Sequence, residues 1–342
     1  MEAFYLQPQP TVWNGNTSGS TSLEKKNQIT TISVFVYLFS ACFVILTVSG
    51  NLIVIISISH FKQLHTPSNV LVLSLAVADF FIGIFSFPFL AIKTIENCWN
   101  FGDIFCFVYN LIGLSLTSVS ISNLVFIAVD RYFAVCDPLL YSTKITVYVA
   151  SVFTAISWLF SLLYTLIILN LNEIGTLGGD EGCRNDCFVI FSANFVIIDL
   201  LVTFIMPYSL MISLYLNIFI VARRHARAIR SMEQNQNCMV GIKKNISTKS
   251  ERKAAKTLGI VMAVFVFCWV PYYICYLIDS FLNISAPAVV KNVLVWLAYF
   301  NSSLNPVIYA FFYPWFQKSL KLIVTCEIFA PASSLINLFV DS

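Results

Sequence analysis

Asp199 is an acidic residue inside an otherwise apolar run, and it is the first candidate for chemistry in this chain. Residues 191–206 read FSANFVIIDLLVTFIM, and no Lys or Arg occurs between Cys187 and Val221 to pair with the carboxylate. An Asp at a bilayer centre costs roughly 2.5–3.5 kcal/mol, so intramembrane acids usually face the protein interior and have a partner. A carboxylate without an internal cation, on a helix that lines a cavity, predicts a site for an external cation.

Aromatic residues occur on the apolar stretches expected to surround this acid. Asp199 lies eight residues before Pro207, about two helical turns toward the outer side. Aromatic faces attract an ammonium group, although aromatic residues in membrane spans also serve as packing. Six rings beside one acid favour an amine site, with the predicted lining Trp269, Tyr272, Tyr273, Tyr276, Trp296 and Tyr299.

The elements that position these residues are seven membrane-spanning helices. Hydrophobic residues make up 58% of the chain and charged residues 11%, whereas a soluble domain carries about 25% charged residues. About 20 apolar residues cross a bilayer, and they do so as helices. The predicted fold is an all-α seven-transmembrane bundle, with spans near 29–59, 68–93, 104–135, 146–170, 188–222, 255–281 and 287–312.

The distribution of basic residues predicts the orientation in the membrane. With the N-terminus outside, 15 of the 20 Lys and Arg residues lie on the inner side, as the positive-inside rule requires. The expected regions are an extracellular segment 1–28, a seven-transmembrane domain 29–312 with an inner loop at about 223–254, and an amphipathic helix with a cytoplasmic tail at 313–342. Residues 1–28 contain no signal peptide, and Asn16 begins a glycosylation sequon.

Several function classes are disfavoured. The basic run 223–256 indicates contact with a membrane surface and a partner, not nucleic acid. The chain has no Gly-rich phosphate loop, nucleophile elbow or metal-spaced His/Cys cluster, so we expect no enzyme and no cofactor. A transporter or channel is a remote alternative, because the sequence shows no inverted repeat of broken helices.

A series of polar motifs, one in each expected span, indicates a family. The series is Asn51, Asp79, Asp130-Arg131-Tyr132, Trp158, Pro207, Cys268-Trp269-Val270-Pro271 and Asn305-Pro306-Val307-Ile308-Tyr309. It resembles the rhodopsin-like G-protein-coupled receptors over the whole chain. The segments NSSLNPVIYAFFYPWF (301–316), HFKQLHTPSN (60–69) and ERKAAKTLGIVMA (251–263) are similar to those of the trace amine-associated receptors.

This resemblance implies an olfactory plasma-membrane receptor for small cationic amines, which signals through a stimulatory heterotrimeric G protein to raise cyclic AMP. A receptor for a non-amine ligand is the alternative. The resemblance also implies a disulfide between Cys106 and Cys187, and Cys98–Cys183 is a separate hypothesis for the remaining outer thiols.

The resemblance implies an activation switch at the inner side. Arg131, flanked by Asp130 and Tyr132, is expected to bridge to Glu251 and to rearrange with Tyr215 and Tyr309; an ordinary interfacial ion pair is the other interpretation. Each proline removes a helix hydrogen bond, so bends are expected at Pro207, Pro271 and Pro306. The resemblance implies that these bends act as hinges and that Trp269 belongs to the switch.

The resemblance further implies a modulatory sodium ion at mid-depth. Asp79, Ser120, Asn301 and Asn305 would surround it, and oxygen ligands suit a hard cation. The alternative is a water-filled polar network with a neutral Asp79.

The chain departs from the family at the usual amine anchor. Aminergic receptors hold the amine with an Asp seven residues after the outer Cys of the third helix, and here that position is Gly113. We therefore expect an inverted pose, with the amine on Asp199 and the rest of the ligand extending past Thr117 toward Gly113, where the missing side chain leaves room. The alternative is that Asp199 is structural and that amine binding is lost.

Overall fold

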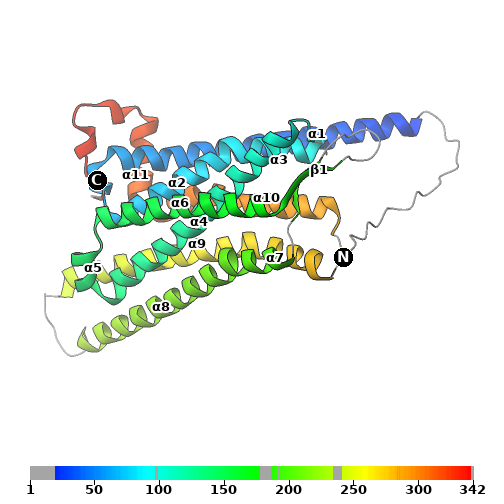
Figure 1. The fold of residues 1–342 in the computed structure, drawn as a ribbon. Coiled ribbons are helices and arrows are strands. Elements are labelled where there is room, and N and C mark those ends of the chain that lie inside the picture. Colours follow the sequence, from blue (N-terminus) through cyan, green and yellow to red (C-terminus); the bar gives the residue numbers. More distant parts are fainter. Residues whose placement is uncertain are drawn as a thin grey trace.

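Long helices that run roughly side by side form the molecule (Figure 1). The computed structural model describes residues 20–96, 99–177, 186–190, 193–233, 241–282, 284 and 286–339. The α-helices are α1 (Ser20–His60), α2 (Pro67–Phe81), α3 (Phe87–Glu96), α4 (Gly102–Cys136), α5 (Pro138–Lys144), α6 (Val147–Leu171), α7 (Ala193–Asp199), α8 (Met206–Glu233), α9 (Gly241–Leu282), α10 (Ala288–Phe312) and α11 (Pro314–Val324).

Short helical turns and one strand pair connect these helices. The π-helices η2 (Ile82–Ser86) and η3 (Leu200–Ile205) join α2 to α3 and α7 to α8. The 3₁₀ turns are η1 (Lys62–Leu64), η4 (Glu327–Phe329) and η5 (Ser333–Leu335). Strands β1 (Glu173–Leu177) and β2 (Asp186–Ile190) pair antiparallel, with Cys187 opposite Thr176. Apart from this pair, the predicted all-α bundle is confirmed.

Membrane-spanning length and composition are met by six helical segments within the described residues. These are Ser33–His60, Pro67–Glu96, Gly102–Cys136, Val147–Leu171, Phe195–Arg224 and Gly259–Leu282. The seventh long helix, α10, packs against α9 and α1. It is less apolar because Asn301, Ser302, Ser303 and Asn305 are buried in it.

The predicted span 188–222 begins too early. Residues 188–190 belong to β2, and the helix begins at Ala193. The apolar residues that follow Cys187 read equally well as strand or helix, and pairing with β1 makes them a strand. At the other end, α8 continues to Glu233 and α9 begins at Gly241, so most of the expected loop 223–254 is helical.

Threonine and proline residues define where several helices start. Thr66 accepts a hydrogen bond from the Asn69 N–H at 3.3 Å, and Thr146 accepts one from the Val149 N–H at 3.2 Å. Pro67 occupies the first turn of α2, where its missing N–H costs nothing. These caps mark the ends of the connections that precede α2 and α6.

Polarity is arranged with apolar residues outside and polar residues inside. Phe35, Leu163 and Leu216 are 67%, 58% and 58% exposed, whereas Asn51 and Asp79 are fully buried. This arrangement suits a chain whose solvent is lipid. Below, the disulfide end is the end of the bundle with β1 and β2, and the tail end is the opposite end, with α5 and α11 (Figure 1).

Candidate ligand-binding site

Asp199 lies where the helical geometry changes. It is the last residue of α7, and the π-helix η3 follows it. Pro207 has no N–H, and just before it the Met206 N–H donates to the Leu201 carbonyl, a π-type bond. Short π-helical turns are frequent at functional sites. The wide turn presents Asp199 and Thr203 toward neighbouring helices.

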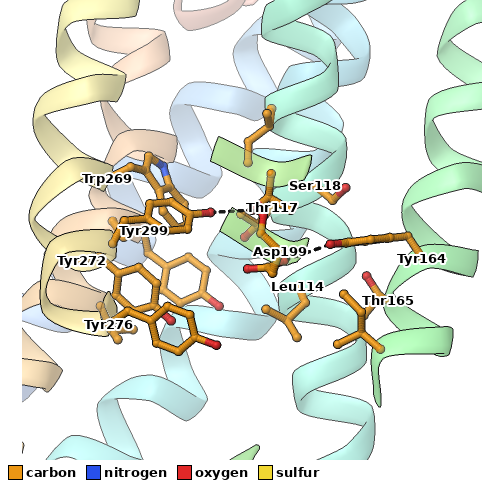
Figure 2. A pocket seen from close by; sticks show the side chains of 16 residues that line it. Leu114, Thr117, Ser118, Tyr164, Thr165, Asp199, Trp269, Tyr272, Tyr276 and Tyr299 are labelled. Atoms are coloured by element: carbon orange, nitrogen blue, oxygen red, sulfur yellow. Dashed lines mark hydrogen bonds between the residues drawn. The ribbon is translucent and has the colours of Figure 1, made fainter. Parts of the chain in front are cut away.

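Hydroxyl groups, not cations, contact this acid. The Tyr164 hydroxyl of α6 donates to Asp199 Oδ1 at 3.2 Å (Figure 2). Thr203 donates to the Asp199 backbone carbonyl at 2.6 Å and also bonds the Tyr273 hydroxyl at 2.9 Å. Among the described residues no Lys, Arg or His forms an ion pair with Asp199. Within the described residues, the side chain that contacts the Asp199 carboxylate is therefore a neutral hydroxyl donor.

A cavity of about 110 Å³ opens beside Asp199, and we call it the Asp199 cavity. One wall is aromatic: the rings of Tyr272 and Tyr276 stack with centroids 6.2 Å apart and planes 7° apart. In Figure 2 Tyr272 and Tyr276 of α9 and Tyr299 of α10 lie across this space from Asp199. The predicted site residues that line it are Thr117, Asp199, Trp269, Tyr272, Tyr273, Tyr276 and Tyr299.

A second cavity of about 340 Å³ adjoins the first toward the disulfide end. The two share Leu114, Tyr272, Tyr276, Val295 and Tyr299 as lining residues. Lys291 of α10 and Asp279 of α9 form an ion pair of 2.6 Å in its wall. Gly113, predicted to lie beside the ligand, lines this second cavity.

Gly113 does not leave the open space that we expected. A Cβ atom at this position would lie 2.9 Å from the Tyr299 hydroxyl oxygen. Tyr299 thus occupies the volume that a larger side chain at 113 would need. The space that a side chain on α4 would take at position 113 is filled by the Tyr299 side chain of α10.

Trp296 lies outside both cavities, contrary to the prediction. Its Nε1 donates to Thr94 Oγ1 at 3.1 Å, and its ring stacks on Phe87 at 5.5 Å. The residue therefore joins α10 to α3. Sequence reasoning missed Tyr164, Thr165 and Ser118, which line the Asp199 cavity. Tyr164 could have been found from the sequence, because its hydroxyl group lies in an apolar span and needs a polar partner inside the bundle.

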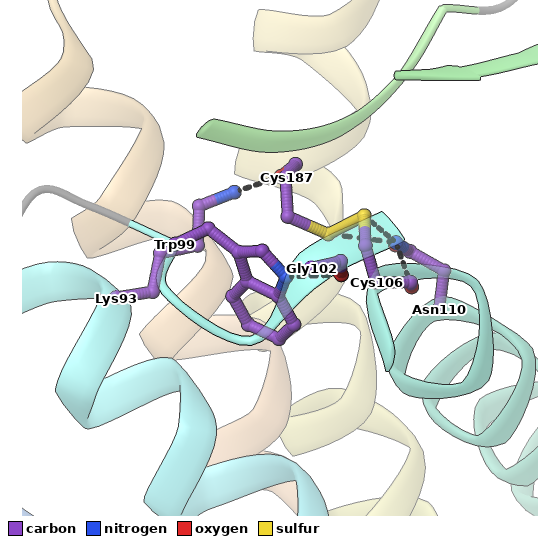
Figure 3. The surroundings of a disulfide bond; sticks show 6 residues. All are labelled: Lys93, Trp99, Gly102, Cys106, Asn110 and Cys187. Carbon is purple, nitrogen blue, oxygen red and sulfur yellow. Dashed lines mark hydrogen bonds between the residues drawn. A yellow bond between two sulfur atoms is a disulfide. The ribbon is translucent and has the colours of Figure 1, made fainter. Parts of the chain in front are cut away.

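The disulfide between Cys106 and Cys187 is present, as predicted, with Cα atoms 5.6 Å apart. Asn110 donates to the Cys106 carbonyl at 2.9 Å, and Lys93 donates to the Cys187 carbonyl (Figure 3). Trp99 Nε1 donates to the carbonyl of Gly102, whose φ of 78° favours glycine. The disulfide, the Lys93 hydrogen bond and a contact of Asn110 Nδ2 with Cys187 Sγ at 3.3 Å hold β2 over the second cavity. Asn16, Cys98 and Cys183 lie outside the described residues.

A hydrogen-bonded cluster surrounds Asp130 at the tail end. Asp130 accepts from Arg131 Nε at 2.9 Å, from Ser68 at 2.7 Å and from the Tyr141 hydroxyl at 3.1 Å. Arg131 also donates to Ser68. Burial raises the pKa of Tyr141, so its hydroxyl remains a donor at neutral pH. This cluster ties α5 and α2 to α4; the side chain of Glu251 lies outside the described residues.

The remaining switch residues lie near this cluster or deeper in the bundle. Tyr215 packs against the core between α4, α8 and α9, and Tyr309 is buried with its ring 5.7 Å from that of Tyr313. Tyr132 contacts the ring of Phe133 at 5.5 Å. Pro271 and Pro306 are both inside long helices.

Three of the four expected sodium ligands are joined directly. Asp79 accepts from Ser120 at 3.3 Å and from Asn305 at 2.7 Å. Asn301 is buried, and its Oδ1 has no hydrogen-bond partner among the described residues. All four contribute oxygen atoms, which fits a hard cation.

Comparison with known proteins agrees with this architecture. The model of the 7 transmembrane receptor (rhodopsin family) matches residues 50–309. The chain belongs to that family. The receptor is 46% identical over 324 residues to trace amine-associated receptor 13c of Danio rerio, covering 94% of each chain. It is 41% identical to trace amine-associated receptor 1 of Macaca mulatta, covering 94% of this chain and 96% of the relative.

The family confirms several predictions. Trace amine-associated receptor 4 of Rattus norvegicus is 40% identical over 326 residues and is covered over 94% of its length. The predicted resemblance to the trace amine-associated receptors is thus confirmed. The receptor is a multi-pass membrane protein and not an enzyme.

Proposed function

We propose that this receptor detects small amines and that Asp199 binds their ammonium group. The observation that carries the proposal is the pairing of two facts: Asp199 has no cationic partner in the described residues, and it faces a wall of tyrosines. The relatives are named as trace amine receptors, which supports the same ligand class. Gly113, where an anchoring acid is usual, offers no charge.

The ligand would extend from Asp199 toward the second cavity. The shared lining residues Tyr272, Tyr276 and Tyr299 give it an aromatic path. Because Tyr299 covers Gly113, the body of the ligand would lie on the tyrosines and not against the α4 backbone.

Signalling through a stimulatory G protein is part of the proposal. The surface that would bind it is the tail end, where Arg131 and the inner ends of α8 and α9 lie. We also propose an extracellular N-terminus with glycosylation at Asn16, supported by the excess of basic residues on the tail-end side. A sodium ion held by Asp79, Ser120, Asn301 and Asn305 would act as a modulator.

Asp199→Asn tests the amine site, because it keeps the shape and removes the charge. An ammonium about 4 Å from a carboxylate gains about 4 kcal/mol at an effective dielectric of 20, and desolvation of both ions offsets part of this. A net gain of about 2.7 kcal/mol corresponds to about a hundredfold in affinity. We expect amine potency to fall by at least that order.

The measurement is cyclic AMP production in transfected cells exposed to 2-phenylethylamine, isoamylamine and 1,5-diaminopentane, with surface expression measured in parallel. Asp279→Asn is the matched control, because it removes a carboxylate that already has Lys291 as its partner. Equal potency of every active amine on Asp199→Asn and the unmodified receptor would contradict the proposal. An amine response through another messenger would contradict only the G-protein subtype.

A further inference from the structure

The chain after α11 folds back on itself. Residues 325–339, which we call the tail segment, contain the two 3₁₀ turns η4 and η5. Cys326 and Ala332 reverse the chain direction with φ angles of 60° and 62°. The Ser333 hydroxyl donates to the Ile328 carbonyl at 2.6 Å, which closes the segment.

The tail segment is docked on the tail end of α1. Ser333 Oγ lies 2.9 Å from His60 Nε2, and the Leu338 N–H donates to Gln63 Oε1 at 3.1 Å. Ile328 and Leu338 are buried in one apolar cluster with Phe61 of the α1–η1 junction. These contacts fix the position of the tail segment relative to the bundle.

Other apolar side chains of this region are left uncovered. Phe329 is 86% exposed, Leu335 61% and Phe339 60%, and Val324 at the end of α11 is 72% exposed. Glu327 is the only Asp, Glu, Lys, Arg or His between residues 322 and 339. If these side chains faced water, their exposure would cost free energy, because removing apolar area from water is favourable.

The location of the tail segment indicates what covers these side chains. In Figure 1 it lies beside the last turns of α1 and on the outer side of the bundle, away from α8 and α9. The exposed surface of α1 is itself apolar, with Ile45 65% and Leu52 40% exposed. The uncovered side chains of the tail segment therefore continue a surface that already faces lipid.

We propose that the tail segment is a folded membrane anchor, whose exposed apolar side chains insert into the bilayer at the tail end of α1. The partner is lipid, because the segment is nearly uncharged and adjoins the lipid-facing surface of α1. The anchor is independent of the amine site and would operate with or without ligand.

Site-directed spin labelling tests the anchor in the full-length receptor. Phe329→Cys and, separately, Phe339→Cys carry a nitroxide in a background where cysteines other than Cys106 and Cys187 are replaced. The control is Ser142→Cys in α5, an exposed polar position at the tail end. Each protein is placed singly in a lipid nanodisc, and collisions with oxygen and with a water-soluble nickel chelate are measured.

We expect the oxygen-to-nickel collision ratio at residues 329 and 339 to be several-fold higher than at residue 142, because oxygen concentrates in lipid. Nickel collisions as frequent at 329 and 339 as at 142 would overturn the proposal. Protection of 329 and 339 from both reagents would also overturn it, since protein and not lipid would then cover them. Equal chromatographic profiles of the labelled proteins show that the comparison is between folded receptors.

Discussion

At the residue scale, the Tyr299 side chain of α10 lies directly against Gly113 of α4. In most aminergic receptors the α4 position carries the charge, whereas here it carries no side chain and the Tyr299 hydroxyl fills the space. The distance of 2.9 Å from a Cβ at 113 to that oxygen is too short for an ordinary contact. In a receptor with this pair, a side chain on α4 at position 113 requires the Tyr299 hydroxyl to shift.

Gly113→Ala should therefore destabilise the receptor. Overpacking of a close-packed interior typically costs about 1–3 kcal/mol, so the melting temperature of the purified protein should fall. Adding Tyr299→Phe removes the oxygen and should recover most of the loss. Gly259→Ala is the control: no atom lies within 4 Å of its Cβ position, and the change should be neutral or slightly stabilising. A melting temperature unchanged by Gly113→Ala would show that Tyr299 is free to move.

Tyr164→Phe probes how Asp199 is held. The hydroxyl donates to Asp199 Oδ1 at 3.2 Å, and a typical hydrogen bond contributes about 0.5–1.5 kcal/mol. We expect amine potency to fall by roughly threefold to tenfold, far less than for Asp199→Asn. The dose–response curve for cyclic AMP measures this. A loss as large as that of Asp199→Asn would mean that Tyr164 itself contacts the ligand.

At the scale of elements, the Asp130 cluster joins three of them. Ser68 of α2, Arg131 of α4 and Tyr141 of α5 all donate to one carboxylate. Arg131 is thus neutralised by its own neighbour. The bridge from Arg131 to Glu251 stays a prediction, because the side chain of Glu251 lies outside the described residues.

Arg131→Ala should abolish amine-stimulated cyclic AMP while surface expression and amine binding persist, because Arg131 is proposed to contact the G protein. The matched control is Lys62→Ala, an exposed basic residue of η1 at the same end and outside the proposed surface of α4, α8 and α9, which should signal normally. Both variants are compared by cyclic AMP assay and by surface labelling. Full signalling by Arg131→Ala would remove this residue from the proposed switch.

Element types were more predictable than their contacts. Long apolar runs predicted the helices, but the apolar residues after Cys187 fit strand and helix alike, so the start of α7 was wrong. Trp296 lies one turn from Tyr299, yet it turns toward Thr94 and Phe87. Helical spacing predicts the angle between two side chains of one helix, but it does not predict which neighbouring helix each side chain contacts. The contact of Tyr164 with Asp199 depends on where α6 packs, and the contact of Trp296 with Thr94 depends on where α3 packs.

At the scale of the whole molecule, the disulfide end is held by a covalent link between distant segments. Cys106 and Cys187 are 81 residues apart in sequence, and their bond holds β2 over the second cavity. The family resemblance predicted this pair. The sequence could not predict the folded tail segment, because its docking on His60 and Gln63 depends on contacts between residues 273 and 275 positions apart.

The double substitution Cys106→Ser with Cys187→Ser should lower stability and surface expression. A disulfide typically contributes about 2–4 kcal/mol, and here its loss also releases β2 from α4. Cys42→Ser, which removes an exposed free thiol, serves as the control. Thermal unfolding of the purified proteins measures the difference. Equal unfolding temperatures would show that Lys93 and Asn110 suffice to hold β2.

The ion pair between Asp279 and Lys291 lies on the route that an amine would follow to Asp199, so it bears on how fast a ligand arrives and leaves. An approaching ammonium meets a carboxylate that is already occupied by a lysine, and exposed charges along a path alter encounter rates more than final affinity. Lys291→Ala should speed amine association and make it more sensitive to salt. Binding kinetics at low and high ionic strength would measure this, and unchanged rates would show that amines enter by another route. Asp199 holds the bound amine in the unmodified receptor and in Lys291→Ala alike, so the equilibrium affinity should change little. The dissociation rate should then rise by the same factor as the association rate. The ion pair would therefore set the residence time of the ligand more than the strength of the response at equilibrium.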